Sequence, residues 1–274
     1  MASITIRDMS ILFPIYHSES RSLKKAVVAA ATSRRLGEDQ KHRLVVEALR
    51  DISFSLATGD RLGLVGSNGA GKTTLLRSLA GIYEPVQGGI TIEGKVTSLL
   101  DPGQGMNMEL TGRENIRLRG LFDRLGQKQI AQLEEDVAEF AELGQFLDLP
   151  VRMYSSGMIV RLSFGMATAV KPQILLMDEW LMAGDAAFME KAKHRLETMV
   201  RGAELLVLSS HSAPTIMQWC NRVIWMDRGR INVDGTPEEV LSAYLPPEQY
   251  AEAKAMQEIS QQYEHLSEEV LSPG

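Results

Sequence analysis

The stretch Gly66-Ser-Asn-Gly-Ala-Gly-Lys-Thr73 has the residue types and spacing of a phosphate-binding loop. Its glycines let successive backbone N–H groups turn inward around phosphate oxygens, which side chains at those positions would block. Lys72 is placed for the β- and γ-phosphates of a nucleotide, and Thr73 offers a hydroxyl to Mg²⁺. The alternative is a chance glycine-rich turn, but strand-like residues 61–65 and helix-like residues 73–83 flank the loop as nucleotide binding requires. The expected nucleotide-binding residues are Ser67, Asn68, Gly69, Ala70, Gly71, Lys72, Thr73 and Thr74.

Two acidic residues end a second strand-like stretch, Ile174-Leu-Leu-Met-Asp178-Glu179. Buried parallel strands end at the sheet edge where ligands bind, so Asp178 is expected to reach the Mg²⁺ of the phosphate loop. Glu179 is then placed to orient or deprotonate an attacking water. A pair of helix-capping acids is the structural alternative. His211 follows another such stretch, LLVLSSHS, and is a candidate γ-phosphate sensor, although a lone histidine is more often structural.

Residues 154–158 read YSSGM and precede the mostly apolar run IVRLSFGMATAV. Serine is a favourable helix N-cap, so the segment could be a plain helix start. Serine hydroxyls and backbone N–H groups at a helix N-terminus also attract anions, so it could instead bind phosphate. This segment by itself leaves both interpretations open.

Short apolar stretches separated by helical ones predict the framework that holds these residues. Strand-like patterns lie at residues 3–6, 52–56, 61–65, 90–92, 96–100, 174–177 and 205–208. Apolar residues recur at helical spacing between Gln129 and Phe146. This alternation predicts an α/β fold with a mostly parallel sheet covered on both faces. RVIWMDRGRIN predicts a hairpin turning at Asp227–Gly229, and Thr236-Pro-Glu-Glu239 predicts a capped helix start.

Composition narrows the class of partner. A net charge of −6 gives no global signature of nucleic-acid binding, and the single cysteine, Cys220, suits a reducing compartment. The N-terminus lacks the basic and apolar regions of a signal peptide, and no run approaches 18 consecutive apolar residues. We therefore expect no nucleic-acid partner, and a membrane role only through another subunit.

The order of phosphate loop, serine-glycine segment, Asp-Glu strand and histidine resembles the nucleotide-binding subunit of an ABC transporter, from residue 3 to about 245. YSSGM stands where that family usually has LSGGQ, with Ser155 and Gly157 matching and Ser156 and Met158 replacing Gly and Gln. The resemblance implies a P-loop ABC cassette with a RecA-like core sheet, an antiparallel β subdomain and a helical signature subdomain at about 105–170. It implies an ABC ATPase domain over 1–245 and a short helical tail over 246–274.

The same resemblance implies ATP and Mg²⁺ as cofactors and a homodimer that sandwiches two ATP molecules. Ser155, Ser156 and Gly157 would then act on the γ-phosphate of the ATP held by the other chain. Phe13 is the expected adenine-stacking residue, with Tyr16 and a simple packing role as alternatives. Gln104, or Asp101 instead, would link Mg²⁺ to the membrane subunit, and Asp185 would lie in the acidic loop at the dimer interface. Trp180 is expected to serve packing.

Three further segments, ELTGREN at 109–115, DEWLMAGDAAF at 178–188 and LFPIYHSESRSLK at 12–24, resemble one branch of that family. That branch exports lipid-linked polysaccharides such as O-antigen, capsule and teichoic acid. It implies an ATPase working with two copies of a transmembrane permease subunit on a lipid-linked glycan. The expected place is the cytoplasmic face of the inner membrane, reached through the permease.

Other classes fit less well. A soluble ABC ATPase of DNA repair or translation would usually carry coiled-coil insertions or two cassettes, and a P-loop kinase or GTPase would not explain YSSGM or His211. An importer ATPase also belongs to the superfamily. A basic insertion at about 17–47 is expected to be loop or mixed helix, either facing anionic lipid or simply solvated; its basic residues are Arg21, Lys24, Lys25, Arg34, Arg35, Lys41 and Arg43.

Overall fold

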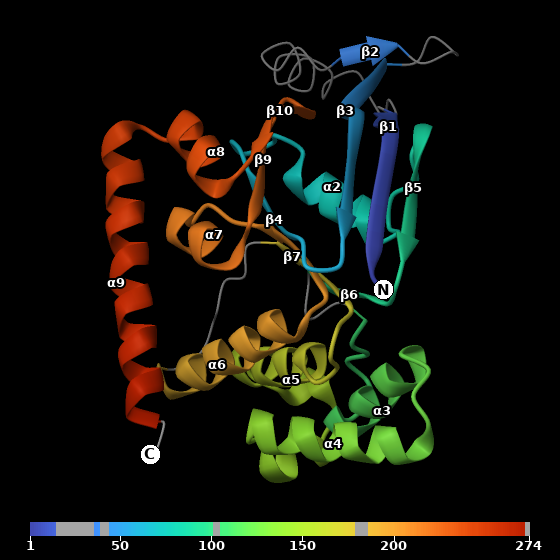
Figure 1. Cartoon of the computed structure of the whole chain (residues 1–274). Helices are drawn as coiled ribbons and strands as arrows, with labels where there is room; N and C mark the ends of the chain where they lie inside the picture. Colours follow the sequence, from blue (N-terminus) through green and yellow to red (C-terminus); the bar gives the residue numbers. More distant parts are fainter. Residues whose placement is uncertain (15–35, 39–43, 101–104, 179–185, 272–274) are drawn as a thin grey trace. The chain divides into compact units, whose positions relative to one another are not determined.

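The computed structural model describes residues 1–14, 36–38, 44–100, 105–178 and 186–271. The chain divides into two compact units (Figure 1). The first unit comprises Met1–Val96, Leu176–Glu179 and Glu204–Gly274. The second comprises Thr97–Leu175 and Trp180–Ala203.

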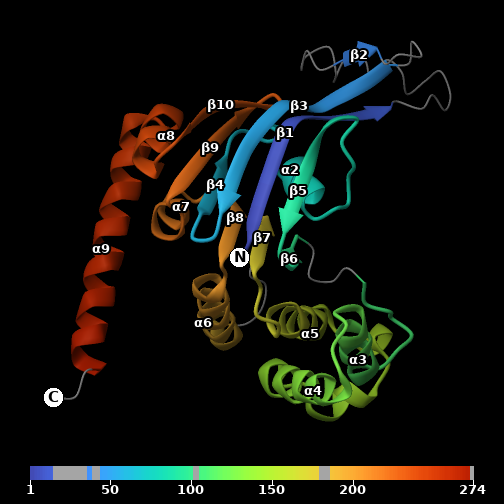
Figure 2. The same ribbon diagram turned by 45° about the vertical axis from the view of Figure 1, so that its right-hand side comes forward.

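An antiparallel sheet in the first unit has the strand order β2-β3-β1-β5. Its strands are β1 (Ser3–Pro14), β2 (Leu36–Glu38), β3 (Leu44–Ala57) and β5 (Gln87–Glu93). Ile4 and Ile6 of β1 are buried and alternate with more accessible residues, because successive side chains of a strand point to opposite faces. Figure 2 shows β1, β3 and β5 running side by side.

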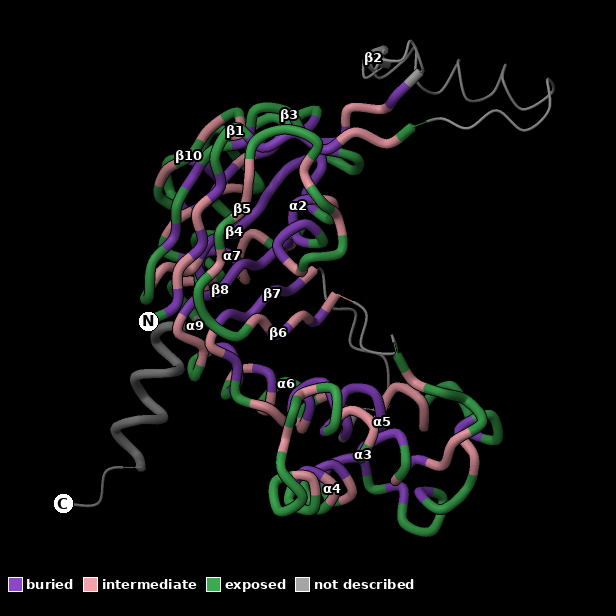
Figure 3. Tube along the Cα trace, turned by 90° about the vertical axis from the view of Figure 1, so that its right-hand side faces the viewer, coloured by how far each residue is buried: buried purple, intermediate pink, exposed green. Residues whose placement is uncertain are grey.

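A second sheet has the order β10-β9-β4-β8-β7-β6. Its strands are β4 (Arg61–Val65), β6 (Val96–Leu99), β7 (Ile174–Asp178), β8 (Leu205–Ser209), β9 (Arg222–Asp227) and β10 (Arg230–Gly235). Strand β4 is parallel to both β8 and β9. Strands β4, β7 and β8 are buried over most of their length, as Figure 3 shows, which explains their continuous apolar sequences. The predicted α/β fold with an added antiparallel sheet is confirmed.

Helices complete the first unit. They are α2 (Lys72–Leu79), α7 (Ala213–Trp219), α8 (Pro237–Tyr244) and α9 (Pro247–Leu271). The predicted capping box is confirmed at α8, where Thr236 and Glu239 satisfy each other's backbone N–H groups. The predicted hairpin is also confirmed, since β9 and β10 pair across Arg228 and Gly229, both at positive φ. No helix in the described part of the chain is long and apolar enough to span a membrane.

Two strand predictions were too short. Strand β1 extends to Pro14 rather than ending at residue 6, and β3 begins at Leu44 rather than at residue 52. Both strands are interrupted by a residue at positive φ, Asp8 in β1 and Asp51 in β3. These irregularities break the alternation of apolar and polar residues on which the prediction depended. Residues 36–38 and 44–47 of the expected insertion are therefore strand.

The second unit is helical. It contains α3 (Gly112–Phe122), α4 (Gln127–Ala141), the 3-10 turns η1 (Gly144–Asp148) and η2 (Val151–Met153), α5 (Ser156–Thr168) and α6 (Ala186–Gly202). Its core gathers Ile116, Leu133, Val137, Leu147 and Leu162. The helix expected from 129 to 146 ends at Ala141, because Glu142 turns into the left-handed region at φ 56°.

Candidate nucleotide-binding site

The phosphate loop joins the buried strand β4 to the start of α2. Gly66 opens the loop at φ 144°, and a Cβ atom there would lie 2.3 Å from the carbonyl oxygen of Met226 in β9. No other residue type fits this position without moving the strand. The loop backbone is further set by a hydrogen bond of 2.9 Å from Ala70 N to Ser67 O. The central sheet therefore determines the path of the loop.

Lys72 is the first residue of α2 and is only 8% exposed. Its Nζ donates to Gly66 O at 2.6 Å and to Ser67 O at 3.4 Å, so the ammonium group is held over the loop. The first turn of α2 contains no acidic residue, so no side chain there opposes an anion at this helix N-terminus. A cation and a helix N-terminus meet at one place, which is the arrangement that binds phosphate.

A pocket of about 310 Å³ lies over this loop. It brings together residues from distant parts of the sequence, including Phe13, Asp178 and His211. The full lining is Phe13, Ala48, Asn68, Gly69, Ala70, Gly71, Lys72, Thr73, Thr74, Asp178 and His211. All predicted residues of the first unit within the described ranges line this pocket except Ser67, which contacts Lys72 through its carbonyl oxygen.

His211 lies just after β8 and contacts the phosphate-loop lysine. Its Nε2 is 3.5 Å from Lys72 Nζ. His211 is exposed and lines the pocket.

The pocket offers two hard oxygen donors suited to Mg²⁺. The hydroxyl of Thr73 is on an exposed residue, and Asp178 is a half-buried carboxylate at the end of β7. Hydroxyl and carboxylate oxygens, completed by waters and phosphate oxygens, form the usual octahedral environment of this ion. The donor chemistry therefore fits the metal that the sequence motif implies.

Phe13 lines the pocket and packs against a second aromatic residue, Tyr83. Phe13 meets Tyr83 edge to face, with ring centroids 5.0 Å apart and an interplanar angle of 77°. Arg77 of α2 donates to the hydroxyl of Tyr83 at 3.3 Å, so Tyr83 connects Phe13 to the helix that follows the phosphate loop. An aromatic face lining the pocket is the group that would stack on a nucleobase.

Three residues that line the pocket or contact its parts were not predicted from the sequence. Ala48 lines the pocket from β3, and Tyr83 fixes Phe13. Gly229, in the β9–β10 turn, donates to Ala70 O at 2.8 Å and accepts from Arg50 N at 2.8 Å. The residue types of the turn predicted the hairpin but not its contact with the phosphate loop. Ala70 and Gly229 are 159 positions apart in the sequence, and no local pattern relates them.

The serine-glycine segment lies in the second unit. Ser155 is the N-cap of α5, and its Oγ accepts a hydrogen bond of 3.3 Å from Met158 N. Ser155, Ser156 and Gly157 are all exposed. The helix start predicted for YSSGM is therefore formed, and phosphate binding by this segment stays a prediction.

Several predicted positions lie outside the described residues. These are Tyr16, Asp101, Gln104, Glu179, Trp180, Asp185 and the seven basic residues of the insertion. The roles given to all site residues, described or not, stay predictions.

A glycine-rich loop between a buried strand and a helix, with a lysine over it and a carboxylate at the end of another strand of the same sheet, defines a P-loop nucleotide-binding protein. The family model described as ABC transporter matches residues 49–182. The O-antigen export system ATP-binding protein RfbE of Yersinia enterocolitica is 43% identical over 235 residues, which is 84% of this chain and 97% of that protein. The chain belongs to the ABC transporter family of ATP-binding proteins.

Two further relatives carry related names. The O-antigen export system ATP-binding protein RfbB of Klebsiella pneumoniae is 36% identical over 85% of this chain and 93% of its own length. The teichoic acids export ATP-binding protein TagH of Lactococcus lactis is 39% identical over 76% of this chain and 45% of its own length.

Solved structures share the fold. One described as the ATP binding subunit of an ABC transporter has a TM-score of 0.63 at 21% identity, covering 92% of this chain and 99% of that chain. A dimeric ATP-binding cassette bound to ADP and Pi has a TM-score of 0.62 at 17% identity, covering 85% of this chain and 98% of that chain.

Proposed function

We propose that this chain is the ATP-hydrolysing subunit of a bacterial exporter for a lipid-linked polysaccharide of the O-antigen, capsule or teichoic-acid kind. Two copies would work with two membrane permease subunits at the cytoplasmic face of the inner membrane. The proposed ATP hydrolysis is supported by one pocket whose lining includes Lys72, Thr73, Asp178 and His211. The names of relatives that match most of this chain support the choice of polymer export.

In the proposed mechanism the loop backbone and Lys72 bind the β- and γ-phosphates of ATP, and Phe13 stacks on the adenine. Thr73 and Asp178 would hold Mg²⁺, which when bound neutralises phosphate charge. Glu179, directly after Asp178, orients and deprotonates the water that attacks the γ-phosphate. His211 reaches the γ-phosphate from the end of β8. The products are ADP and phosphate.

The serine-glycine segment completes the site in trans. Ser155 and the backbone N–H groups of the first turn of α5 cap the γ-phosphate of ATP bound by the other chain. Two chains thus form two composite sites, and ATP joins them. Gln104 would link Mg²⁺ to the permease, and Asp185 would lie in the acidic loop at the dimer interface.

Ser155→Arg is expected to block ATP-driven dimer closure while leaving ATP binding by a single chain nearly unchanged, because Ser155 is far along the chain from the phosphate loop and acts on the partner's nucleotide. A mixed dimer of a Lys72→Ala chain and a Ser155→Arg chain keeps one intact composite site, so mixing should restore ATP hydrolysis. Hydrolysis is measured after the mixed assembly is confirmed by differential tags. No recovery at all would contradict action in trans.

Loss of the gene is expected to remove the surface polysaccharide while its lipid-linked form accumulates inside the cell. The wild-type chain should restore export, and a Lys72→Ala chain at equal protein level should not. Surface polymer and lipid-linked intermediate are both quantified in the same strains. Normal surface polymer in the deletion strain would overturn the export function and leave a soluble ABC ATPase of DNA repair or translation, or another transporter branch, as the alternative.

A further inference from the structure

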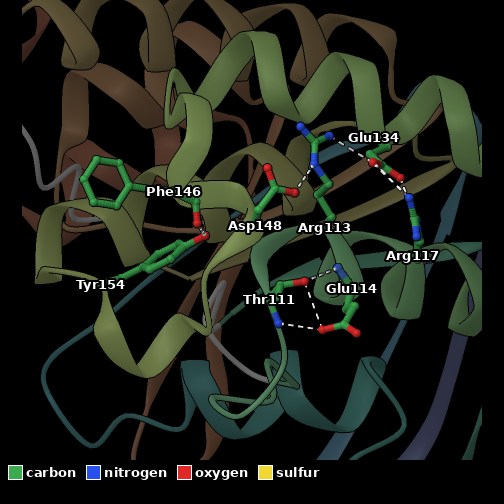
Figure 4. A network of polar contacts seen from close by, with 8 residues as sticks. All are labelled: Thr111, Arg113, Glu114, Arg117, Glu134, Phe146, Asp148 and Tyr154. Carbon is green, nitrogen blue, oxygen red and sulfur yellow. Dashed lines mark hydrogen bonds and ion pairs between the residues drawn. The ribbon is translucent and has the colours of Figure 1, made fainter.

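The TGREN residues, Thr111–Asn115, begin at Thr111, which pairs with Pro150 in the segment that leads into Ser155. Figure 4 shows Thr111, Arg113 and Glu114 of this motif together with Asp148 and Tyr154. We propose that TGREN, together with Asp148 and Tyr154, positions Ser155 and the first turn of α5 for the partner's ATP. We name this set the signature clamp. The proposal rests on the proposed action of Ser155 in trans and assigns positioning residues to that site.

Backbone pairing is the first part of the signature clamp. Thr111 and Pro150 form an isolated antiparallel bridge. On the side of the bridge toward Ser155, Val151 N donates to Leu110 O and Arg152 N donates to Met108 O, both at 2.9 Å. The chain entering YSSGM is therefore held along the chain entering α3, only a few residues before Ser155.

Gly112 and Tyr154 form the second part. Tyr154 immediately precedes Ser155 and is 8% exposed, and its hydroxyl donates to Phe146 O at 2.6 Å. A Cβ atom at position 112 would lie 2.5 Å from that hydroxyl and 3.2 Å from Leu147 O. Glycine at 112 thus makes room for the tyrosine. Burial raises the pKa of the Tyr154 phenol, against a smaller opposing effect of a hydrogen bond with the Gly112 backbone.

Arg113 forms the third part by joining three segments. Its Nε donates to Asp148 Oδ1 at 2.8 Å in η1, and its NH1 donates to Glu134 Oε1 at 3.0 Å in α4. Arg117 donates to the same Glu134 at 2.7 Å. These hydrogen bonds, the one from Arg117 first, lower the pKa of Glu134 against its partial burial, so the carboxylate stays charged. A guanidinium fork can hold two carboxylates in fixed directions, which a lysine cannot do.

The remaining TGREN residues fix the loop before α3. Thr111 and Glu114 form a capping box, with Thr111 N donating to Glu114 Oε2 at 2.8 Å. Asn115 is 3% exposed, accepts from Asn107 N at 2.8 Å and donates to Asn107 O at 3.0 Å and Thr111 O at 2.9 Å. Thr111, Glu114 and Asn115 therefore fix residues 107–111, which pair with residues 150–152.

Rigid support at this place has a direct consequence for phosphate binding. Ser155 and the N–H groups of the α5 first turn are exposed and receive their ligand from another molecule. Donors of this kind act only when held within about 0.5 Å of their target. Tyr154 is the residue through which the signature clamp sets the backbone position of Ser155.

Tyr154→Phe tests the inference in a way that a general folding role would not satisfy. In the mixed dimer, the Lys72→Ala chain supplies the working Ser155, whereas the Ser155→Arg chain supplies the working Lys72. Tyr154→Phe in the Lys72→Ala chain should lower ATP hydrolysis about 10-fold, the effect of losing a buried hydrogen bond where geometry matters. The same substitution in the Ser155→Arg chain should have little effect.

Arg113→Gln is the second variant and should show the same asymmetry between the two chains. Arg119→Gln is the matched control, because Arg119 lies on the same helix and pairs with Asp123 at 2.9 Å, outside the signature clamp. It should leave hydrolysis unchanged in either chain. Thermal unfolding of each purified full-length chain shows whether it is folded.

The outcomes separate the two ideas. Two results with an active mixed dimer would overturn the signature clamp and leave the proposed function standing. In one, Tyr154→Phe and Arg113→Gln lower hydrolysis equally in either chain; in the other, they leave it unchanged in both, as Arg119→Gln does. An inactive mixed dimer overturns action in trans, and the signature clamp with it. As an independent measurement, Tyr154→Phe should weaken ATP-driven dimerisation of a Glu179→Gln chain about 10-fold. Unchanged dimerisation would also count against the positioning role.

Discussion

Lys72→Ala is expected to weaken ATP binding at least about 100-fold, because it removes the charged donor from the β- and γ-phosphates. The ammonium group of Lys72 is held by Gly66 O at 2.6 Å, and the residue is 8% exposed. Among the described residues that line the pocket there is no second lysine to take its place. Affinity is measured on the single chain by titration calorimetry, and ATP hydrolysis is expected to be lost with it.

Lys193→Ala is the matched control for this variant. Lys193 is exposed on α6 and lies 4.0 Å from Glu197, in the second unit and outside the pocket lining. ATP affinity should stay unchanged in the control. Thermal unfolding without nucleotide distinguishes lost binding from lost folding, since Lys72→Ala also removes a donor from Gly66 O. Equal ATP affinity in wild type and Lys72→Ala would refute the role of Lys72.

Glu179→Gln is expected to lower ATP turnover about 100-fold or more while leaving ATP affinity intact. The amide keeps the size of the side chain but cannot take a proton from water. ATP should then hold two chains together, so the variant is expected to form a stable dimer with ATP that disperses without it. Turnover is followed by phosphate release, and dimer formation by sedimentation.

Glu190→Gln is the matched control for Glu179→Gln, because it removes the same negative charge from an exposed residue of α6 outside the pocket lining. It should retain normal turnover and show no trapped dimer. Undiminished hydrolysis by Glu179→Gln would remove Glu179 from the proposed mechanism and leave the nucleotide-binding role of Lys72 intact.

Local sequence determined the features that depend on a few neighbouring residues. The phosphate loop, the β9–β10 turn and the Thr236 capping box were predicted correctly as local structure, and the helix start at YSSGM was one of two interpretations that the sequence left open. Each depends on backbone freedom or on a hydrogen bond within about three residues, so residue type and spacing suffice. The strand ends at Pro14 and Leu44 were missed, because Asp8 and Asp51 break the periodic pattern.

Only the tertiary structure decided which distant groups meet. The sequence predicted that Asp178 and His211 follow strands that end near the phosphate loop, and the parallel pairing of β4 with β8 agrees with this. It did not predict that Ala48 of β3 lines the same pocket or that Gly229 contacts Ala70. TGREN was a mark of resemblance until Gly112 and Arg113 were seen against Tyr154 and Asp148. Such contacts depend on the packing of segments that are distant in the chain, and packing is a property of the folded chain that no local pattern encodes.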